Sequence, residues 1–328
     1  MIITKTPYRI SFFGGGSDYP DWYIKNGGVV LSTTIDKYIY LSCRNLPPFF
    51  KHKHRIVWSK VELVNKIKDI QHKAVNKMLE HYKINKGIEL HYDGDLPARS
   101  GMGSSSSFVV GLINTLNCLN TKKLNKKELA IKSIKFEQKI LKDTVGSQDQ
   151  IAASYGGFNK ITFFPKGDFK VSSIKITSSN KRNLNKNLIL LYTGVQRTAH
   201  NIASSYANKL KNEKRDEILK ILEIAKKAEM HLKNNSHDEF GMLLHKTWLI
   251  KKALSQKVSN NYINDIYNDA IKKGALGGKL LGAGGGGFFL FYVPIKKQKK
   301  FINHFNKFVH IPFNFETLGS RIIFNQKN

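Results

Sequence analysis

Serines and glycines crowd residues 96–107, whose sequence is LPARSGMGSSSS. The apolar run FVVGLINTLN follows directly and is typical of a helix. A helix begins with unpaired backbone N–H groups and the positive end of its dipole, and glycines let an oxyanion approach that backbone closely. A strand, a glycine turn, serines and a helix in this order therefore predict a phosphate-binding loop. The alternative is an ordinary helix cap, for which one serine would suffice.

Two familiar motifs do not fit this stretch. No lysine follows the glycines, so G-x-x-x-x-G-K-[ST] is missing, and G-x-S-x-G is missing as well.

A second glycine-rich stretch, GAGGGGFF at residues 282–289, contains G-x-G-x-x-G. A strand-like run, FFLFYV, comes after it, whereas a dinucleotide-binding fold needs a helix there. We interpret it as a turn whose backbone passes close to a ligand or another loop, with a plain inter-strand turn as the alternative.

A third glycine-rich stretch, TPYRISFFGGGSDYPDWY, lies near the N-terminus at residues 6–23. Arg9 falls on a predicted strand, and three glycines break that strand just before Asp18. A carboxylate directly after a glycine turn can bind the hydroxyl groups of a polyol. A single Arg or Asp is also common on a protein surface, so both interpretations stay open on these residues alone.

The composition points to a cytoplasmic globular protein with an anionic ligand. The formal net charge is +30, but lysine supplies most of the 54 basic residues and the lysines are scattered along the chain. Arginine is the usual reader of bases, so its scarcity argues against a nucleic-acid partner. No apolar run approaches the length of a membrane span, and the N-terminus does not resemble a signal peptide. Cys43 and Cys118 form no disulfide framework, which is typical of a reducing compartment.

The elements that must position these stretches are mixed in order, so we expect an α+β fold in two lobes. The patterns predict strands at residues 1–13, 27–46, 87–97, 156–164 and 188–194, and a further strand after the turn at residues 282–287. They predict helices at residues 60–82, 125–142, 205–234 and 262–273 and from residue 104 onward. The polar stretch at residues 180–187 is predicted to be a linker.

In this order, the three glycine-rich stretches resemble the motifs of the GHMP small-molecule kinases. The first family motif is similar to TPYRISFFGGGSD, and the third is similar to KLLGAGGGGFF. The second, P-x-x-x-G-[LM]-G-S-S, is met by Pro97, Gly101, Met102, Gly103, Ser104 and Ser105. The resemblance implies a two-lobed GHMP kinase fold, with a ribosomal-protein-like N-terminal lobe at residues 1–185 and a ferredoxin-like C-terminal lobe at residues 186–328. ATP and Mg²⁺ are the implied cofactors.

The resemblance also implies a role for individual residues. The motif residues just named, together with Ser106, would bind the nucleotide, and Ser105 and Glu137 would hold Mg²⁺. Asp149 would act beside the substrate hydroxyl, with Arg9 as the neighbouring cation. The implied substrate-binding residues are Gly15, Gly16, Ser17, Asp18, Gly157 and Arg197. Taken without the family, Asp149 could cap a helix, Glu137 could pair with a lysine at i+4, and Arg197 could lie on the surface.

The resemblance is strongest to the branch of the family that phosphorylates sugars at the anomeric carbon. A heptose 7-phosphate is the implied acceptor, and a fucose-type or other sugar is the alternative. Two rivals stay open: an isoprenoid kinase or decarboxylase of the same family, and a non-catalytic basic protein that binds nucleic acid or sugar. We expect no membrane partner and leave a homodimer open.

Overall fold

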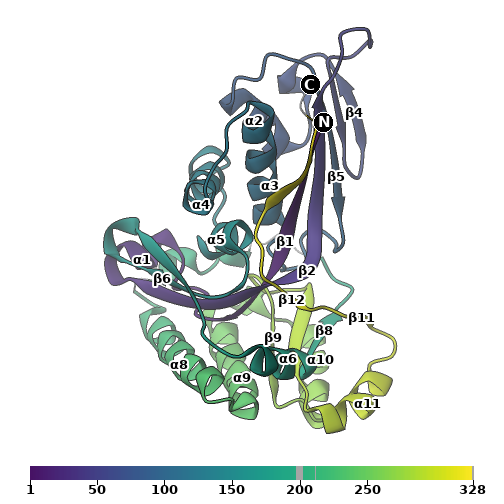
Figure 1. Ribbon diagram of the computed structural model, residues 1–328. Helices are drawn as coiled ribbons and strands as arrows, with labels where there is room; N and C mark the ends of the chain where they lie inside the picture. The colour runs from purple at the N-terminus through teal and green to yellow at the C-terminus, as the bar shows by residue number, and fades with distance from the viewer. Residues whose placement is uncertain (197–201, 211, 327–328) are drawn as a thin grey trace.

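The longest strands form a large sheet in the computed structural model, which describes residues 1–196, 202–210 and 212–326 (Figure 1). In sheet order, its main path is β13-β1-β2-β5-β3-β4, while β6 and β12 also pair with β2, and β7 pairs with β6. Among the strands of the described residues, only β3 and β5 pair in parallel. The strands are β1 (Ile2–Phe13), β2 (Gly28–Asn45), β3 (His54–Val57), β4 (Val61–Val64), β5 (Ile88–Gly94), β6 (Phe158–Phe163), β7 (Phe169–Ser173), β12 (Phe315–Glu316) and β13 (Arg321–Asn325).

Helices from the first half of the chain cover one side of this sheet (Figure 1). They are α1 (Pro20–Asn26), α2 (Lys73–His81), α3 (Ser104–Leu119), α4 (Lys126–Lys135) and α5 (Gln148–Tyr155). A further helix, α6 (Ser178–Lys186), lies away from them, beside the second lobe (Figure 1). Helix α3 packs on β1 and β2 with an almost continuous buried surface, which its apolar sequence explains. Helix α4 runs into a π-helical turn at Phe136–Ile140, a distortion that is frequent at functional sites.

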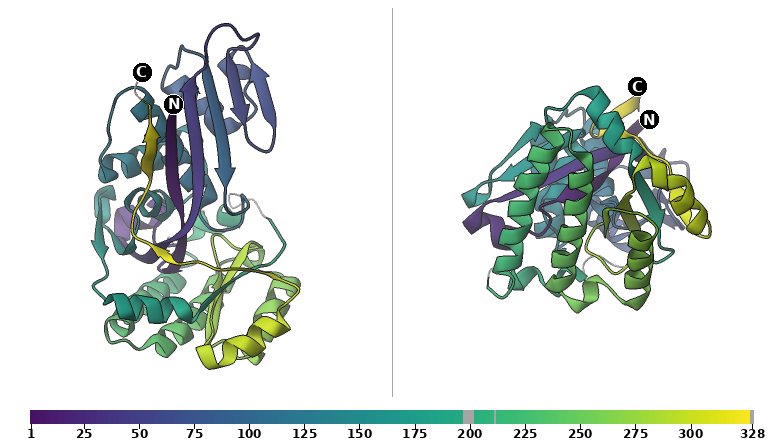
Figure 2. Two further views of the ribbon diagram at one scale, coloured as in Figure 1. Left: turned by 45° about the vertical axis from the view of Figure 1, so that its right-hand side comes forward. Right: turned by 90° about the horizontal axis from the view of Figure 1, so that it is seen from below.

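A second, four-stranded antiparallel sheet has the order β11-β8-β10-β9. Its strands are β8 (Leu188–Tyr192), β9 (Gly277–Leu280), β10 (Phe288–Tyr292) and β11 (Val309–Ile311). The helices of this lobe are α8 (Arg215–Lys233), α9 (His237–Leu254), α10 (Asn261–Lys272) and α11 (Ile295–His304). They occupy the end of the molecule that is seen from below in Figure 2. The expected two-lobed α+β fold is confirmed, and this strand order is the ferredoxin-like one.

The two ends of the chain lie side by side. Strand β13 pairs with β1 and β12 pairs with β2, so the last strands return to the large sheet after the second lobe is complete (Figures 1 and 2). The division of the two lobes between residues 185 and 186 stays a prediction. The first strand of the second sheet, β8, begins close to it, at Leu188.

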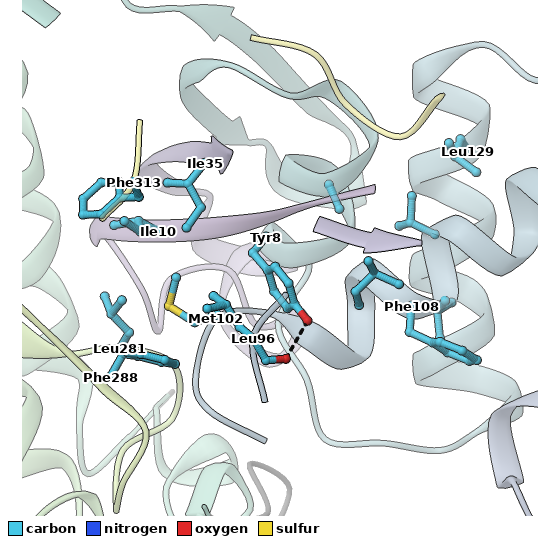
Figure 3. Close-up of a cluster of buried hydrophobic side chains, with 14 of the residues drawn as sticks. Tyr8, Ile10, Ile35, Leu96, Met102, Phe108, Leu129, Leu281, Phe288 and Phe313 are labelled. Atoms are coloured by element: carbon cyan, nitrogen blue, oxygen red, sulfur yellow. Dashed lines mark hydrogen bonds between the residues drawn. The ribbon is translucent and has the colours of Figure 1, made fainter. Parts of the chain in front are cut away.

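The stretch at residues 96–107, called the phosphate-loop stretch after its predicted role, is anchored in the hydrophobic core that both lobes share. Met102 is fully buried in one cluster with Leu281 and Phe288 of the second lobe (Figure 3). The Tyr8 hydroxyl, also fully buried, donates a hydrogen bond to the Leu96 carbonyl oxygen over 2.9 Å, where the stretch begins. The core therefore fixes this loop at its start and at its turn.

Three sequence predictions of secondary structure need correction. Residues 60–82 are not one helix, because β4 and a 3₁₀ turn at Ile67–Asp69 precede α2. The buried Glu62 carboxylate fixes this path by accepting hydrogen bonds from the Trp58 indole and the backbone of Gln71. Residues 180–187 are largely helical rather than a linker, since the Thr177 side chain caps α6 at its start. The helix predicted from residue 205 begins at Arg215, after a short 3₁₀ turn at Ala207–Lys209.

Candidate active site

The three glycine-rich stretches meet around one cleft between the lobes. Its cavity has a volume of about 290 Å³. The residues of these stretches that line it are Arg9, Ser11, Gly15, Gly16, Asp18 and Tyr19 from the first, Arg99, Gly101, Gly103, Ser104, Ser105 and Ser106 from the second, and Gly282, Ala283, Gly284 and Gly286 from the third. Stretches that are far apart in the sequence therefore form one continuous wall.

The phosphate-loop stretch approaches the third glycine stretch backbone to backbone. Gly101 has a φ of +84°, and a β-carbon placed there would lie 2.5 Å from the Leu281 carbonyl oxygen. The Phe288 amide donates a hydrogen bond to the Ser100 carbonyl oxygen over 3.1 Å and ties the two loops together. Gly103, at φ +75°, then turns the chain into α3. The N-terminus of α3 consequently faces the cleft, in a position that suits an anion.

Arg9 holds Asp149 in a bidentate ion pair inside the cleft. Its Nε donates to Asp149 Oδ1 over 2.7 Å and its Nη2 donates to Oδ2 over 2.6 Å. The third nitrogen, Nη1, donates to the Gly101 carbonyl oxygen over 2.7 Å. Asp149 lies in the first turn of α5, and its carboxylate is turned to Arg9 rather than to the helix end. One guanidinium thus fixes the carboxylate relative to the phosphate loop. Since no other described residue donates to it, each carboxylate oxygen keeps one lone pair for a further hydrogen bond.

Asp18 is buried and lines the same cavity. The Gly16 amide donates to Asp18 Oδ1 over 2.9 Å, and the Gln148 amide donates to Oδ2 over 3.4 Å. A β-carbon at Gly146 would lie 1.9 Å from Oδ2, so the glycine there makes room for the carboxylate. Burial, and then the negative charge of Asp149, raise the pKa of Asp18 to about 6.

The Glu137 carboxylate accepts hydrogen bonds from serine hydroxyls at the start of α3. Ser105 Oγ donates to its Oε1 over 3.1 Å and Ser106 Oγ donates to its Oε2 over 2.7 Å. The Gln150 side-chain amide also donates to Oε2. Complete burial is the main cause that raises the pKa of Glu137 to about 7. The predicted pairing with a lysine on the same helix is not what the structure shows, because these partners come from α3 and α5.

Several predicted site residues do not line the cavity. Met102 is part of the core, and Pro97 lies outside the lining. Ser17 is buried and its hydroxyl donates to the Gly14 carbonyl oxygen over 2.8 Å. Gly157 lies at a turn where its amide donates to Thr34 Oγ1 over 2.8 Å. Arg197 falls outside the described residues, so its role stays a prediction, as do the roles of the other four.

The sequence reasoning missed two buried lysines and a threonine in the wall of the cleft. Lys251 and Thr247 come from α9, and Lys279 comes from β9. Nothing in a chain so rich in lysine marks Lys251 as different. A signal does exist for Lys279, since it stands in the apolar run that leads into the third glycine stretch. Among the described residues, no cluster of three or more His, Cys, Asp or Glu side chains could hold a metal by itself.

Two family models match this chain and cover the second and third glycine-rich stretches. The model described as "GHMP kinases N terminal domain" matches residues 65–157, and the one described as "GHMP kinases C terminal" matches residues 224–308. The chain belongs to the GHMP kinase family. It is therefore a phosphotransferase with an alcohol group as acceptor and ATP as phosphate donor, which sets aside the non-catalytic alternative.

Individual relatives place it among the sugar kinases of that family. It is 32% identical to the "D-glycero-alpha-D-manno-heptose 7-phosphate kinase" of Campylobacter jejuni, with 93% of each chain covered. It is 23% identical to the galactokinase of Pyrococcus furiosus, over 91% of this chain and 90% of that one. The structure of a "D-glycero-D-manno-heptose 1-phosphate kinase" from Bacteriodes thetaiotaomicron superposes with a TM-score of 0.81 at 22% identity over the whole of both chains.

The helices carry one further observation. In residues 1–196, 202–210 and 212–326, none of them has both the length and the apolar character that crossing a bilayer requires.

Proposed function

We propose that this sugar kinase transfers the γ-phosphoryl group of ATP to the anomeric hydroxyl of a heptose 7-phosphate. The observation that carries the proposal is the Arg9–Asp149 ion pair. The Arg9 guanidinium also donates to the Gly101 carbonyl oxygen, which connects the ion pair to the phosphate loop. It sets a carboxylate at the place where a nucleotide held at the start of α3 would meet a hydroxyl. The identity with the Campylobacter jejuni kinase supports the choice of sugar.

Within this proposal, each residue has a defined task. Asp149 accepts the proton of the attacking hydroxyl or orients it, and Arg9 fixes the direction of its carboxylate. Asp18 accepts hydrogen bonds from sugar hydroxyls. Serine hydroxyls and amides at the start of α3 bind phosphate oxygens, which carry the charge during phosphoryl transfer. An anomeric hydroxyl is more acidic than a simple alcohol, so a weak base suffices.

The residues around Glu137 fit an implied Mg²⁺ ion. Their donor set consists of hard oxygens, the Glu137 carboxylate and the Ser105 hydroxyl, and Mg²⁺ in such enzymes commonly takes one or two carboxylates together with substrate phosphates. We propose that these two residues hold the ion. When bound, Mg²⁺ would neutralise charge on the nucleotide phosphates.

A panel of sugars and sugar phosphates with ATP tests the proposal. We expect the highest kcat/KM for heptose 7-phosphate, with the new phosphate on the anomeric carbon in phosphorus NMR. The position must be read directly, because the two heptose kinases above are named for different phosphates. A preference for fucose, galactose or mevalonate, or a phosphate at another carbon, would show that the proposed acceptor is wrong.

Acceptor binding should depend on the ionisation of Asp18. Because its pKa is raised to about 6, the carboxyl is increasingly protonated below that pH, which removes its negative charge and part of its capacity to accept hydrogen bonds. We expect the acceptor KM to rise as the pH falls, approaching about tenfold per pH unit below the pKa. The KM should be measured across this range for the wild type and for Asp18→Asn, since the acceptor's phosphate also titrates there. Identical slopes for the two proteins would contradict the role of Asp18.

A further inference from the structure

Two lysine ammonium groups are buried in the wall of the cleft, and the carboxylate whose charge acts on Lys279, that of Asp18, forms no ion pair with it. Lys251 is 8% exposed and Lys279 is 4% exposed, and both line the cavity. Lys251 Nζ donates to the carbonyl oxygens of Leu280 and Gly282 over 2.8 and 2.5 Å, and Lys279 Nζ donates to Phe12 O over 2.9 Å. In the part of the chain that the structure describes, neither lysine belongs to an ion pair.

Such an arrangement is costly unless an anion enters it. A buried charge is tolerated when it is paired, and carbonyl oxygens replace only part of the water that an ammonium group loses. The positive charge nearby, Arg9, is already paired with Asp149. Burial, followed by the charges of neighbouring cations, lowers the pKa of both lysines, that of Lys279 to about 7. An incoming anion would relieve this unfavourable environment.

A third polar group in the same wall also lacks a partner. The Thr247 hydroxyl lies one helical turn before Lys251, lines the cavity and is 3% exposed. Among the described residues it has no hydrogen-bond partner. A buried hydroxyl that faces a cavity and makes no bond is an independent sign that a polar ligand belongs there.

The position of these groups relates them to the reacting phosphates. Lys251 binds the carbonyl of Gly282, and a β-carbon at Gly282 would lie 2.6 Å from Gly101 Cα in the phosphate loop. Lys279 reaches from β9 to the end of β1, the strand that carries Arg9. The lysines thus face the cleft from the second lobe, while the start of α3 faces it from the first.

We propose that Lys251 and Lys279, with the Thr247 hydroxyl beside them, form a binding site for a phosphate group. Its occupant is either the terminal phosphoryl group of ATP or the phosphate that the acceptor already carries. The second occupant depends on the proposed function, because that function identifies the acceptor. The first occupant, ATP, does not depend on it. In both cases the phosphate oxygens receive charge-assisted hydrogen bonds from the second lobe.

Binding measurements on variants test the site. In Lys251→Met and Lys279→Met we expect the affected ligand to bind about 10- to 100-fold more weakly, the usual effect of losing a hydrogen bond to a charged group. The matched control is Lys252→Met, because Lys252 is the next residue on α9, does not line the cavity and donates to Asn264. The control should bind both ligands like the wild type.

Four calorimetric titrations distinguish the two occupants. Weaker binding of ATP with unchanged binding of ADP assigns the site to the terminal phosphoryl group. Weaker binding of heptose 7-phosphate with unchanged binding of the heptose without phosphate assigns it to the acceptor. If neither ATP nor heptose 7-phosphate binds more than about twofold more weakly in either methionine variant, a change of about 0.4 kcal/mol, the proposal is overturned.

A second pair of variants separates charge from structural support. Glutamine can still donate to the carbonyl oxygens of Phe12 or Gly282 but carries no charge, so Lys279→Gln and Lys251→Gln should fold even where methionine does not. They should bind as weakly as the methionine variants. Recovery of wild-type affinity in the glutamine variants would mean that the lysines only brace the two lobes, which would also overturn the proposal. Because ATP binding needs no acceptor, these results stand even if the sugar assignment fails.

Discussion

Asp149→Asn should lower kcat by about 10²- to 10⁴-fold, the usual contribution of a positioned general base. ATP affinity should stay near that of the wild type, since Asp149 touches the phosphate loop only through Arg9. Asparagine keeps the shape of the side chain and one acceptor for the guanidinium, but it cannot take a proton. Single-turnover rates with saturating ATP and acceptor, together with ATP titrations, measure both effects.

Stability must be followed in the same variant. Arg9 is almost fully buried, and loss of its charged partner in a buried pair costs about 3–5 kcal/mol. Asp149 is 23% exposed, so we expect a destabilisation below that range. Asp168→Asn is the control, because Asp168 is an exposed partner of Lys127 and does not line the cavity. A folded Asp149→Asn protein with undiminished turnover would refute the assigned role.

Gly101→Ala should weaken ATP binding strongly and destabilise the fold. The backbone there has a φ of +84°, which costs a non-glycine residue about 1–3 kcal/mol, and the new methyl group would press on the Leu281 carbonyl oxygen. Relief requires the phosphate loop to separate from the third glycine stretch, which also moves the Gly101 carbonyl away from Arg9. We expect at least a tenfold loss of ATP affinity, corresponding to about 1.4 kcal/mol.

A matched variant isolates the contact between the loops from the strain of the backbone. Gly167 has a φ of +98° in the turn at Pro165–Gly167, and a β-carbon there would meet nothing within 4 Å. Gly167→Ala should therefore show only the conformational cost in denaturant unfolding, with normal ATP binding. Equal losses of ATP affinity in the two variants would show that the approach of Gly101 to Leu281 is not what matters.

Local patterns predicted the elements that carry the glycine stretches better than the elements around them. The start of α3 at Ser104 is visible in the sequence because a glycine turn, serines and an apolar run coincide there. Residues 60–82 were predicted wrongly since their apolar spacing suits a helix, whereas the bonds that keep Glu62 in an extended segment come from the fold. The short helix α6 escaped notice because it buries little more than Leu184 and Asn180.

The same distinction holds for the candidate site. Arg9, Asp18, Glu137 and Asp149 were named from family motifs, and the structure places Arg9, Asp18 and Asp149 around one cavity and Glu137 against the serines that line it. Lys251 could not be found in this way, because its burial results from the packing of α9 beneath the third glycine stretch. Among 54 basic residues, charge alone does not distinguish a buried lysine from a solvated one.

The return of the chain to its first sheet has a mechanical consequence. The polypeptide crosses between the lobes twice, once before β8 and once after β11, and the two crossings are joined where Asn185 Nδ2 donates to the Phe313 carbonyl oxygen over 2.9 Å. Asn314, the next residue, exchanges hydrogen bonds with Asp36 on β2. A doubly tethered joint resists the wide swing that a single hinge allows. We therefore expect nucleotide exchange to depend more on displacement of the loops that line the cleft than on a wide rotation between the lobes.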